Sequence, residues 1–158
     1  GWTANTGEFY RSNTIRCIHG PNFNVLSKKE IEEFENKRFE IDLQSNRMGF
    51  RLKSDPICHT ITPELLSTAV TRGTLQLTPA GQLIVLMADH QTTGGYPRIG
   101  TVISADMASL AQMPIGSSFG IKWIDIQEAE RLLLQQETNL QQLENACKFR
   151  LQEYFSEK

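Results

Sequence analysis

The stretch that decides the fold runs from Leu83 to Pro97 and reads LIVLMADHQTTGGYP. Its first six residues, Leu83 to Ala88, are apolar, and a run of that length fits a β-strand buried on both faces. The run ends in ionisable and small polar residues, followed by Gly94-Gly95, a pair that permits positive φ or close approach to a ligand. A buried strand that leads into a polar loop is a common place for a binding site, although a hairpin turn with hydrophilic side chains has the same pattern.

Alternating or short apolar segments predict further strands on both sides of this stretch. The polar residues 44–47 separate two of these segments, which favours a hairpin there. The segments are residues 14–18, 39–43, 48–52, 74–78, 99–103 and 119–124.

Three brief helices are predicted between the strands. Ser27 and Glu30 form a capping-box pattern for a helix that ends near Asn36. A threonine cap followed by proline predicts a second helix over Pro63–Val70. Ser104 is expected to cap a third helix, which ends at Ala111.

The last part of the chain has a different character. Residues 128–154 contain no glycine or proline and are rich in Gln, Glu, Leu and Arg. Apolar residues recur there at three- or four-residue steps, which predicts a long amphipathic helix. Gln136 and Arg150 lie in the same apolar seam and weaken a coiled-coil interpretation. A helix packed along the barrel or on a partner chain is preferred.

The order of the segments indicates the fold class. Several short strands, hairpin turns and brief helices before Gln127 favour a closed or nearly closed β-rich barrel, a mainly-β (β-rich α+β) fold, over a βαβ fold. We expect residues 1–13 to be a linker or a cut end, residues 14–125 to form the barrel domain, and residues 126–158 to form the C-terminal amphipathic helix.

Composition excludes several classes of partner. With 158 residues and a net charge of −2, the chain offers no electrostatic basis for nucleic-acid binding. Its longest apolar run is too short to span a membrane, and its N-terminus lacks a secretory signal. Three scattered cysteines without a C-x-x-C pair fit a reducing compartment, so a cytoplasmic location is expected.

Self-contained catalytic motifs are absent from the sequence. It has no G-x-x-x-x-G-K-[ST], G-x-G-x-x-G or G-x-S-x-G segment. His19, His59 and His90 lack metal-ligand spacing, so no metal site is predicted. No catalytic residue can be assigned, and a binding surface that completes a site with another domain fits the sequence better.

Three segments together resemble a known family. Residues 73–103, with IRCIHGP at 15–21 and SNRMGFRL at 45–52, are similar to the C subunit of 5-oxoprolinase. That family is also called the Kip antagonist and belongs to the biotin-dependent carboxyltransferase, or allophanate hydrolase subunit 2-like, proteins. The resemblance covers about residues 14–115. The family's front half, with its Thr-Thr-x-Gln-Asp segment, is absent, so the chain resembles the second of two cyclophilin-like β-barrel domains. The long helix after Ile126 has no place in the family pattern.

The resemblance implies a non-autonomous enzyme subunit. It would belong to an ATP-dependent hydrolase, 5-oxoprolinase, that opens the lactam of 5-oxoproline to glutamate. The implied partners are the other 5-oxoprolinase subunits, namely the A subunit and the Kip-inhibitor-like B subunit, with a small amide-like substrate. No cofactor is expected on this domain, and ATP is expected at the level of the complex.

Two other functions stay open at this point. One is a regulatory binding protein that antagonises an inhibitor of a sensor kinase, as the name Kip antagonist implies. The other is the carboxyltransferase part of a biotin-dependent urea carboxylase. The sequence has no Ala-Met-Lys-Met segment for biotin attachment, so that function needs a carrier elsewhere.

The polar loops offer groups that complement small amide-like substrates. Asn46 and Gln91 each carry a carbonyl acceptor and an NH2 donor. Arg47 and Arg98 have the fork geometry for pairing with a carboxylate. The other substrate-binding candidates supply hydroxyls, backbone N–H groups for an oxyanion, and an aromatic wall: Thr92, Thr93, Gly94, Gly95 and Tyr96.

These candidates have structural alternatives. Asn46 and Gln91 are residue types that often satisfy turn backbone groups. Arg47 or Arg98 would pair, as scaffold, with Asp89 or Asp42. The strongest candidates are Asn46, Arg47 and the loop from Gln91 to Tyr96.

Two candidates for proton transfer follow the buried strand directly. His90 is a candidate acid or base, and a hydrogen-bonded structural histidine is its alternative. Asp89 is the other candidate, with fixation of the turn as its alternative role.

Overall fold

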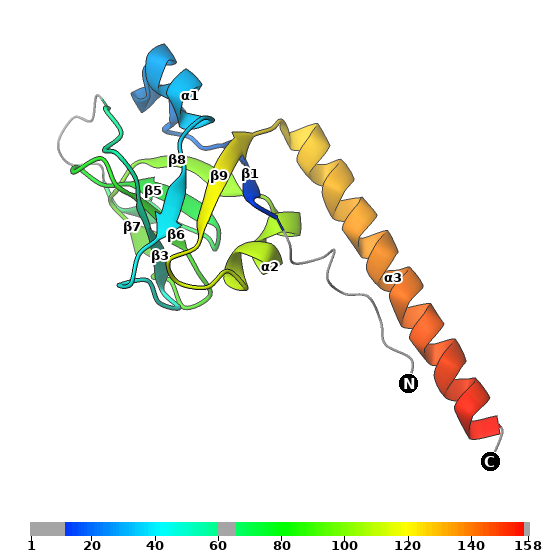
Figure 1. The fold of residues 1–158 in the computed structure, drawn as a ribbon. Coiled ribbons are helices and arrows are strands. Elements are labelled where there is room, and N and C mark those ends of the chain that lie inside the picture. The colour runs from blue at the N-terminus through cyan, green and yellow to red at the C-terminus, as the bar shows by residue number, and fades with distance from the viewer. Residues whose placement is uncertain (1–11, 60–65, 157–158) are drawn as a thin grey trace.

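A closed barrel of seven strands forms the centre of the computed structural model, which describes residues 12–59 and 66–156 (Figure 1). Around the barrel the strands follow the order β1-β8-β5-β6-β3-β2-β9. Neighbouring strands are antiparallel except β1 and β9, which are parallel. Their bounds are β1 Thr14–His19, β2 Phe39–Ile41, β3 Gly49–Lys53, β5 Thr74–Leu77, β6 Leu83–Leu86, β8 Arg98–Val102 and β9 Ser118–Trp123. The predicted mainly-β barrel is therefore confirmed.

Short elements surround the barrel, and one long helix leaves it. Figure 1 shows α3 running from the end of β9 and projecting away from the barrel. Two short strands, β4 and β7, pair with each other outside the barrel. The bounds of these elements are η2 Phe23–Val25, α1 Lys28–Phe34, β4 Thr68–Ala69, β7 Thr93–Gly94, α2 Ser104–Ala111 and α3 Ile126–Ser156. No helix among the described residues is long and apolar enough to cross a membrane.

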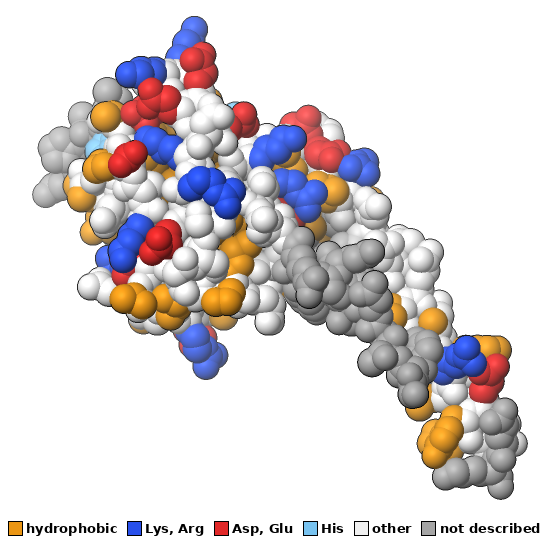
Figure 2. Space-filling view, in the orientation of Figure 1, with side chains coloured by type: hydrophobic (Ala, Val, Ile, Leu, Met, Phe, Trp, Pro, Cys, Tyr) orange, Lys and Arg blue, Asp and Glu red, His pale blue; other side chains and the backbone are white. Residues whose placement is uncertain are grey.

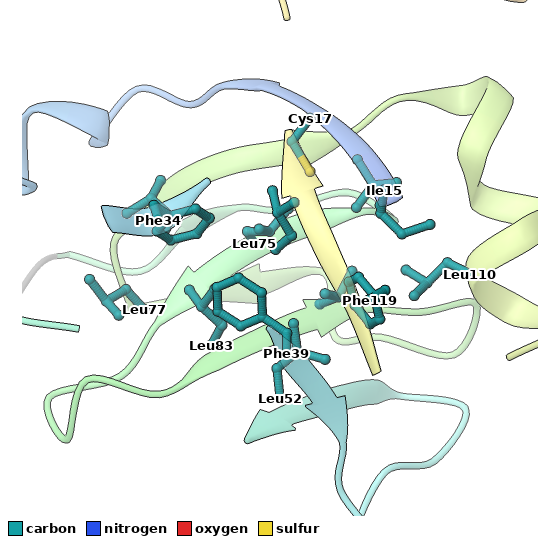
Figure 3. Close-up of a cluster of buried hydrophobic side chains, with 14 of the residues drawn as sticks. Ile15, Cys17, Phe34, Phe39, Leu52, Leu75, Leu77, Leu83, Leu110 and Phe119 are labelled. Atoms are coloured by element: carbon teal, nitrogen blue, oxygen red, sulfur yellow. The ribbon is translucent and has the colours of Figure 1, made fainter. Parts of the chain in front are cut away.

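Inward-facing apolar side chains fill the barrel. Alternate residues of each strand point inward, so strands from both halves of the chain contribute to one cluster (Figure 3). Each large side chain that is fully buried stabilises the fold by about 1.5–3 kcal/mol. Members labelled in the figure are Ile15, Cys17, Phe34, Phe39, Leu52, Leu75, Leu77, Leu83, Leu110 and Phe119.

The helix starts agree only in part with the sequence patterns. Ser27 caps α1 as predicted, because its hydroxyl accepts a hydrogen bond from the Glu30 N–H at 3.2 Å. Helix α2 ends at Ala111 as predicted, but Ser104 is its first helical residue rather than its cap. The cap is Ile103, whose extended backbone donates its N–H to the Arg16 carbonyl at 3.0 Å.

One further local prediction is wrong. The predicted helix over Pro63–Val70 lies partly outside the described residues, and its described end contains strand β4 instead. Pairing explains the difference: the Val70 N–H donates to the Thr92 carbonyl at 3.0 Å, beside the β4–β7 pair. Positive φ occurs at Gly73, Gly81 and Gly116, whereas Gly94 is extended in β7. Of the predicted terminal linker, residues 1–11 lie outside the described residues.

Candidate functional site

A pocket of about 250 Å³ lies on the outer face of strands β3, β6 and β5. It brings together two segments that the sequence singled out, the turn at 44–47 and the loop at 91–96. Its volume is somewhat below the range of about 300–1,000 Å³ that is typical of drug-sized ligands, so it suits a small molecule. The lining residues are Gln44, Asn46, Met48, Gly49, Arg51, Gln76, Ile84, Leu86, Gln91 and Tyr96.

Strand register builds the floor of this pocket. Leu52, Val85 and Leu75 point into the core, so their neighbours along each strand face outward. Arg51 on β3 pairs with Ile84 on β6, and Ile84 pairs with Gln76 on β5. These three side chains therefore form one row on the outer face, which we call the floor row.

Gln76 is a floor residue that the sequence pattern missed. The alternation in 74–78 predicted a strand, and alternation is typical of a half-buried one, but Gln76 is only 1% exposed and all four residues of β5 are buried. The β4–β7 pair covers it: a Cβ built on Gly94 would come within 2.3 Å of the Gln76 Nε2. That buried Nε2 has no hydrogen-bond partner among the described residues. The one sequence signal for the burial of Gln76 was its position as a polar residue between two core leucines.

The predicted amides and the aromatic residue line the pocket rim. Asn46 Oδ1 accepts a hydrogen bond from the Met48 N–H at 2.8 Å. It thus satisfies a backbone group of the turn, which was the structural alternative for this residue. Asn46 nevertheless lines the pocket, together with Gln91 and Tyr96. Gln91 is exposed and Tyr96 is 44% exposed, so both can meet a ligand at the mouth.

The two predicted arginines do not line the pocket. Arg47 Nε lies 3.0 Å from Asp89 Oδ2 in an exposed ion pair, which is the scaffold arrangement considered above. Arg98 donates through Nη1 to the carbonyl of Ala69 at 2.9 Å. The arginine that does line the pocket is Arg51, on the outward face of the predicted hairpin.

The remaining predicted residues lie outside the pocket lining. His90 Nδ1 is 2.5 Å from the carbonyl oxygen of the adjacent Gln91, as in the structural alternative for this histidine. Thr92 and Thr93 are exposed. Gly94 belongs to β7 and covers Gln76, and Gly95 is exposed. None of these positions suggests a direct catalytic role in this structure.

The pocket lining carries one positive charge. Its lining contains Arg51 and four side-chain amides but no carboxylate. The nearby Asp42 has partners of its own: the Gln44 N–H donates to its carboxylate at 2.7 Å and Lys53 Nζ lies at 3.1 Å. The hydrogen bond from Gln44, and next the one from Lys53, hold the pKa of Asp42 below its usual range. The charge of Arg51 also contributes to the lowered pKa of Asp42. Asp42 pairs with Lys53, however, and no ion pair of Arg51 occurs among the described residues, so the guanidinium donors of Arg51 are open to an anion.

A larger hollow of about 550 Å³ lies between β1, β9, α2 and α3. Its central charges are already paired, because Asp106 accepts from the Arg16 backbone N–H at 2.7 Å and from the Arg16 guanidinium at 2.5 and 2.9 Å. Figure 2 shows both signs of charge intermixed over the barrel face in view, without a large patch of one sign. Among the described residues no cluster of three His, Cys, Asp or Glu side chains could hold a metal ion.

Sequence comparisons connect this chain with carboxyltransferase domains. The family model described as carboxyltransferase domain, subdomain A and B, matches residues 3–123. The C subunit of 5-oxoprolinase from Escherichia coli (strain K12) is 39% identical over 131 residues. The C subunit of 5-oxoprolinase from Haemophilus influenzae is 36% identical over 129 residues. These matches cover 83% and 82% of this chain but 42% of each relative, so the chain spans less than half of their length.

Solved structures share the fold. The K. lactis urea amidolyase matches 79% of this chain and 8% of its own, with a TM-score of 0.66 and 19% identity. The Kluyveromyces lactis urea carboxylase matches 79% of this chain and 12% of its own, with a TM-score of 0.65 and 19% identity. At this level of identity the likeness concerns the fold alone.

Proposed function

Since this chain belongs to the carboxyltransferase-domain family (subdomains A and B), we propose that it is the pocket-bearing part of the C subunit of a 5-oxoprolinase. The resemblance in sequence to two proteins of that name supports the assignment. The observation that carries it is the pocket on β3, β6 and β5, lined by four amides and by an arginine without an ion pair among the described residues. Amides and a guanidinium complement a lactam and a carboxylate, the two polar groups of 5-oxoproline.

In this proposal the chain binds and orients the substrate for the complex. Asn46 and Gln91 hydrogen-bond the lactam at the pocket mouth, and Tyr96 forms a wall that limits the size of the ligand. Ring opening breaks the lactam C–N bond, forms a C–O bond from water and gives a proton to nitrogen. The groups that activate water and use ATP are assigned to other parts of the complex, because the sequence has no phosphate-binding glycine loop.

The proposed partners follow from the name of the relatives. Proteins named as one subunit of an enzyme act with other subunits, which we propose to be the A subunit and a Kip-inhibitor-like B subunit of 5-oxoprolinase. We also propose that the chain works in the cytoplasm. The three cysteines, free in the structure, are in keeping with that reducing compartment.

Glutamate release tests this function. The full-length subunit that contains this chain is assembled with its partner subunits, and ATP-dependent glutamate formation from 5-oxoproline is measured. We expect Asn46→Ala and Gln91→Ala each to raise KM or lower kcat by about 10-fold, the range for one or two lost hydrogen bonds. Gln142→Ala, an exposed amide on α3 outside the pocket, is the matched control and should retain full activity.

Two results would contradict the proposal. No glutamate release from a correctly assembled wild-type complex would remove the function itself. Full activity of both pocket variants would remove the assignment of Asn46 and Gln91. Circular dichroism of each variant establishes that the fold is intact before activity is compared.

Carboxyl transfer is a second candidate, because the matching family is described as a carboxyltransferase domain. The same pocket would then orient an amide-like acceptor rather than a lactam. The discriminating assay supplies a carboxylated biotin carrier protein and measures transfer of labelled carboxyl to urea. Transfer to urea without glutamate release from 5-oxoproline would favour this second function.

A further inference from the structure

The floor row presents three different chemical surfaces in a fixed order. Arg51, Ile84 and Gln76 occupy paired positions on three neighbouring strands. Adjacent strands lie about 4.8 Å apart, so the backbones at the two ends of the row are separated by about 10 Å. The row therefore offers a guanidinium, an apolar surface and an amide across the length of one small molecule.

We propose that the floor row recognises a small molecule with a carboxylate at one end and an amide carbonyl at the other. In this arrangement Arg51 is the carboxylate-binding residue and Gln76 is the residue that faces the amide. The inference deepens the proposed function and rests on it, since 5-oxoproline carries both groups on one five-membered ring. It replaces Arg47 and Arg98, which the sequence favoured, with a third arginine.

Among the residues that line the pocket, Arg51 is the one arginine, and it has no ion pair among the described residues. Arg47 is neutralised by Asp89 at 3.0 Å, and Asp42, the acid beside Arg51, is held by Lys53 at 3.1 Å. No carboxylate lines the pocket to compete for the Arg51 guanidinium. A planar guanidinium can donate two parallel hydrogen bonds to a carboxylate, so it fixes the orientation of the ligand as well as its charge.

Gln76 provides independent support, because the residue is 1% exposed and its buried Nε2 lacks a partner among the described residues. An unpaired buried donor destabilises a ligand-free fold. Because this donor packs against Gly94, the Gln76 amide has to rotate toward the pocket that the residue also lines, where a ligand carbonyl would supply the missing acceptor. Gly94 fits this arrangement, since any side chain there would collide with the Gln76 amide.

The centre of the row selects for an apolar middle in the ligand. Ile84 lies between the two polar ends, and a Cβ built on Gly49 would come within 3.0 Å of Ile84 Cγ2. Glycine at that position keeps the space above Ile84 open. Ring CH2 groups of the ligand would pack on Ile84 while its ends meet Arg51 and Gln76.

A binding panel on the chain itself tests the inference by saturation-transfer NMR titration. The probes are L-5-oxoproline, its primary amide, which lacks the negative charge, and cyclopentanecarboxylate, which lacks the lactam. Arg51→Met should raise the Kd of L-5-oxoproline by about 10- to 100-fold, the worth of a charge-assisted pair. The same variant should change the Kd of the primary amide less than about 3-fold, because no charge pair is lost. Arg72→Met, an exposed arginine outside the pocket lining, is the control and should leave every Kd unchanged.

Gln76→Met separates binding from structure. This variant should raise the Kd of L-5-oxoproline by about 10-fold and leave the Kd of cyclopentanecarboxylate unchanged. It should also raise the thermal midpoint of the ligand-free chain, because it removes an unpaired buried donor; a purely structural glutamine would give a lower midpoint. If Gln76→Met does not fold, the titrations of Arg51→Met alone test the inference.

Several outcomes would overturn the inference. One is that the wild type and Arg51→Met bind L-5-oxoproline with equal affinity. Another is that the wild type does not prefer the acid over its primary amide. The third is that no probe binds. Glutamate release by the assembled complex tests the proposed function separately. An active complex whose KM for 5-oxoproline is unchanged by Arg51→Met would refute this inference and leave the proposed function standing.

Discussion

The thiol of Cys17 lies within the barrel core and is fully buried. Burial raises the pKa of this thiol well above its ordinary value, and the nearby Asp106 charge adds to the effect. Because the folded pKa exceeds the unfolded one, the protonated thiol contributes its full stability below the unfolded pKa of about 8.5. That contribution is lost as pH rises through the folded pKa.

Alkaline unfolding measures this contribution. Between pH 8.5 and 9.5 the free energy of unfolding should fall more steeply for the wild type than for Cys17→Ala, by up to about 1.4 kcal/mol per pH unit. Urea titrations at the two pH values give the slopes. Cys58→Ala, at an exposed cysteine, should keep the wild-type slope. Parallel curves for wild type and Cys17→Ala would contradict the account.

A second residue-scale prediction concerns the ion pair between Arg16 and Asp106. Asp106 has a side chain 2% exposed and accepts from both the backbone and the guanidinium of Arg16. Asp106→Asn should lower the free energy of unfolding by about 2–3 kcal/mol, less than for a fully enclosed pair because Arg16 is 34% exposed. Chemical denaturation measures the difference. Glu128→Gln, which breaks the exposed pair with Arg131, should have little measurable effect, and equal losses in both variants would contradict the role of burial.

At the scale of elements, the hairpin between β5 and β6 supports the pocket floor. Its turn contains Gly81 with φ +75°, and an added Cβ there would come within 2.7 Å of the Ile57 carbonyl oxygen. Gly116 has φ +83°, but an added Cβ would meet nothing within 4 Å. The two glycines therefore separate backbone strain from steric collision.

Alanine at these two positions should have different costs. Gly116→Ala should lose about 1–2 kcal/mol of stability from left-handed backbone strain alone. Gly81→Ala should lose about 1–3 kcal/mol more, because the Ile57 backbone must also move. Thermal and urea unfolding of the two variants provide the comparison. Similar stabilities would show that the turn relaxes without cost.

The sequence predicted the barrel because period-two alternation and apolar runs are local signals. Leu83 to Leu86 and Phe39 to Ile41 are strands for the reasons that their side chains suggested. The β4–β7 pair could not be predicted, since each strand has two residues and its partner lies some 25 residues away in the chain. That pair buries Gln76, so β5 is buried on both faces although its sequence alternates.

The site was predictable in its loops and not in its floor. Asn46, Gln91 and Tyr96 are polar or aromatic residues in polar loops, and the structure brings them to one pocket. Arg51 could not be preferred over Arg47, because the choice depends on which arginine meets Asp89 in space. Strand register, which sequence periodicity leaves undefined, places Arg51 and Gln76 on either side of Ile84.

At the scale of the whole molecule, the chain spans 42% of the length of its curated relatives. We therefore predict that the isolated chain binds 5-oxoproline but releases no glutamate, even with ATP. The full-length subunit with its partners should restore turnover, which a coupled glutamate assay detects. Turnover by the isolated chain would show that it carries catalytic groups of its own, contrary to the proposal.

The central claim is that the outer-face pocket over Ile84 holds the substrate. A crystal structure of the chain soaked with saturating L-5-oxoproline tests it most directly. Ligand density is expected over Ile84, with the carboxylate at Arg51 and the lactam carbonyl at Gln76. Density in the hollow beside α3, or an empty pocket in crystals whose pocket is open to solvent, would contradict it.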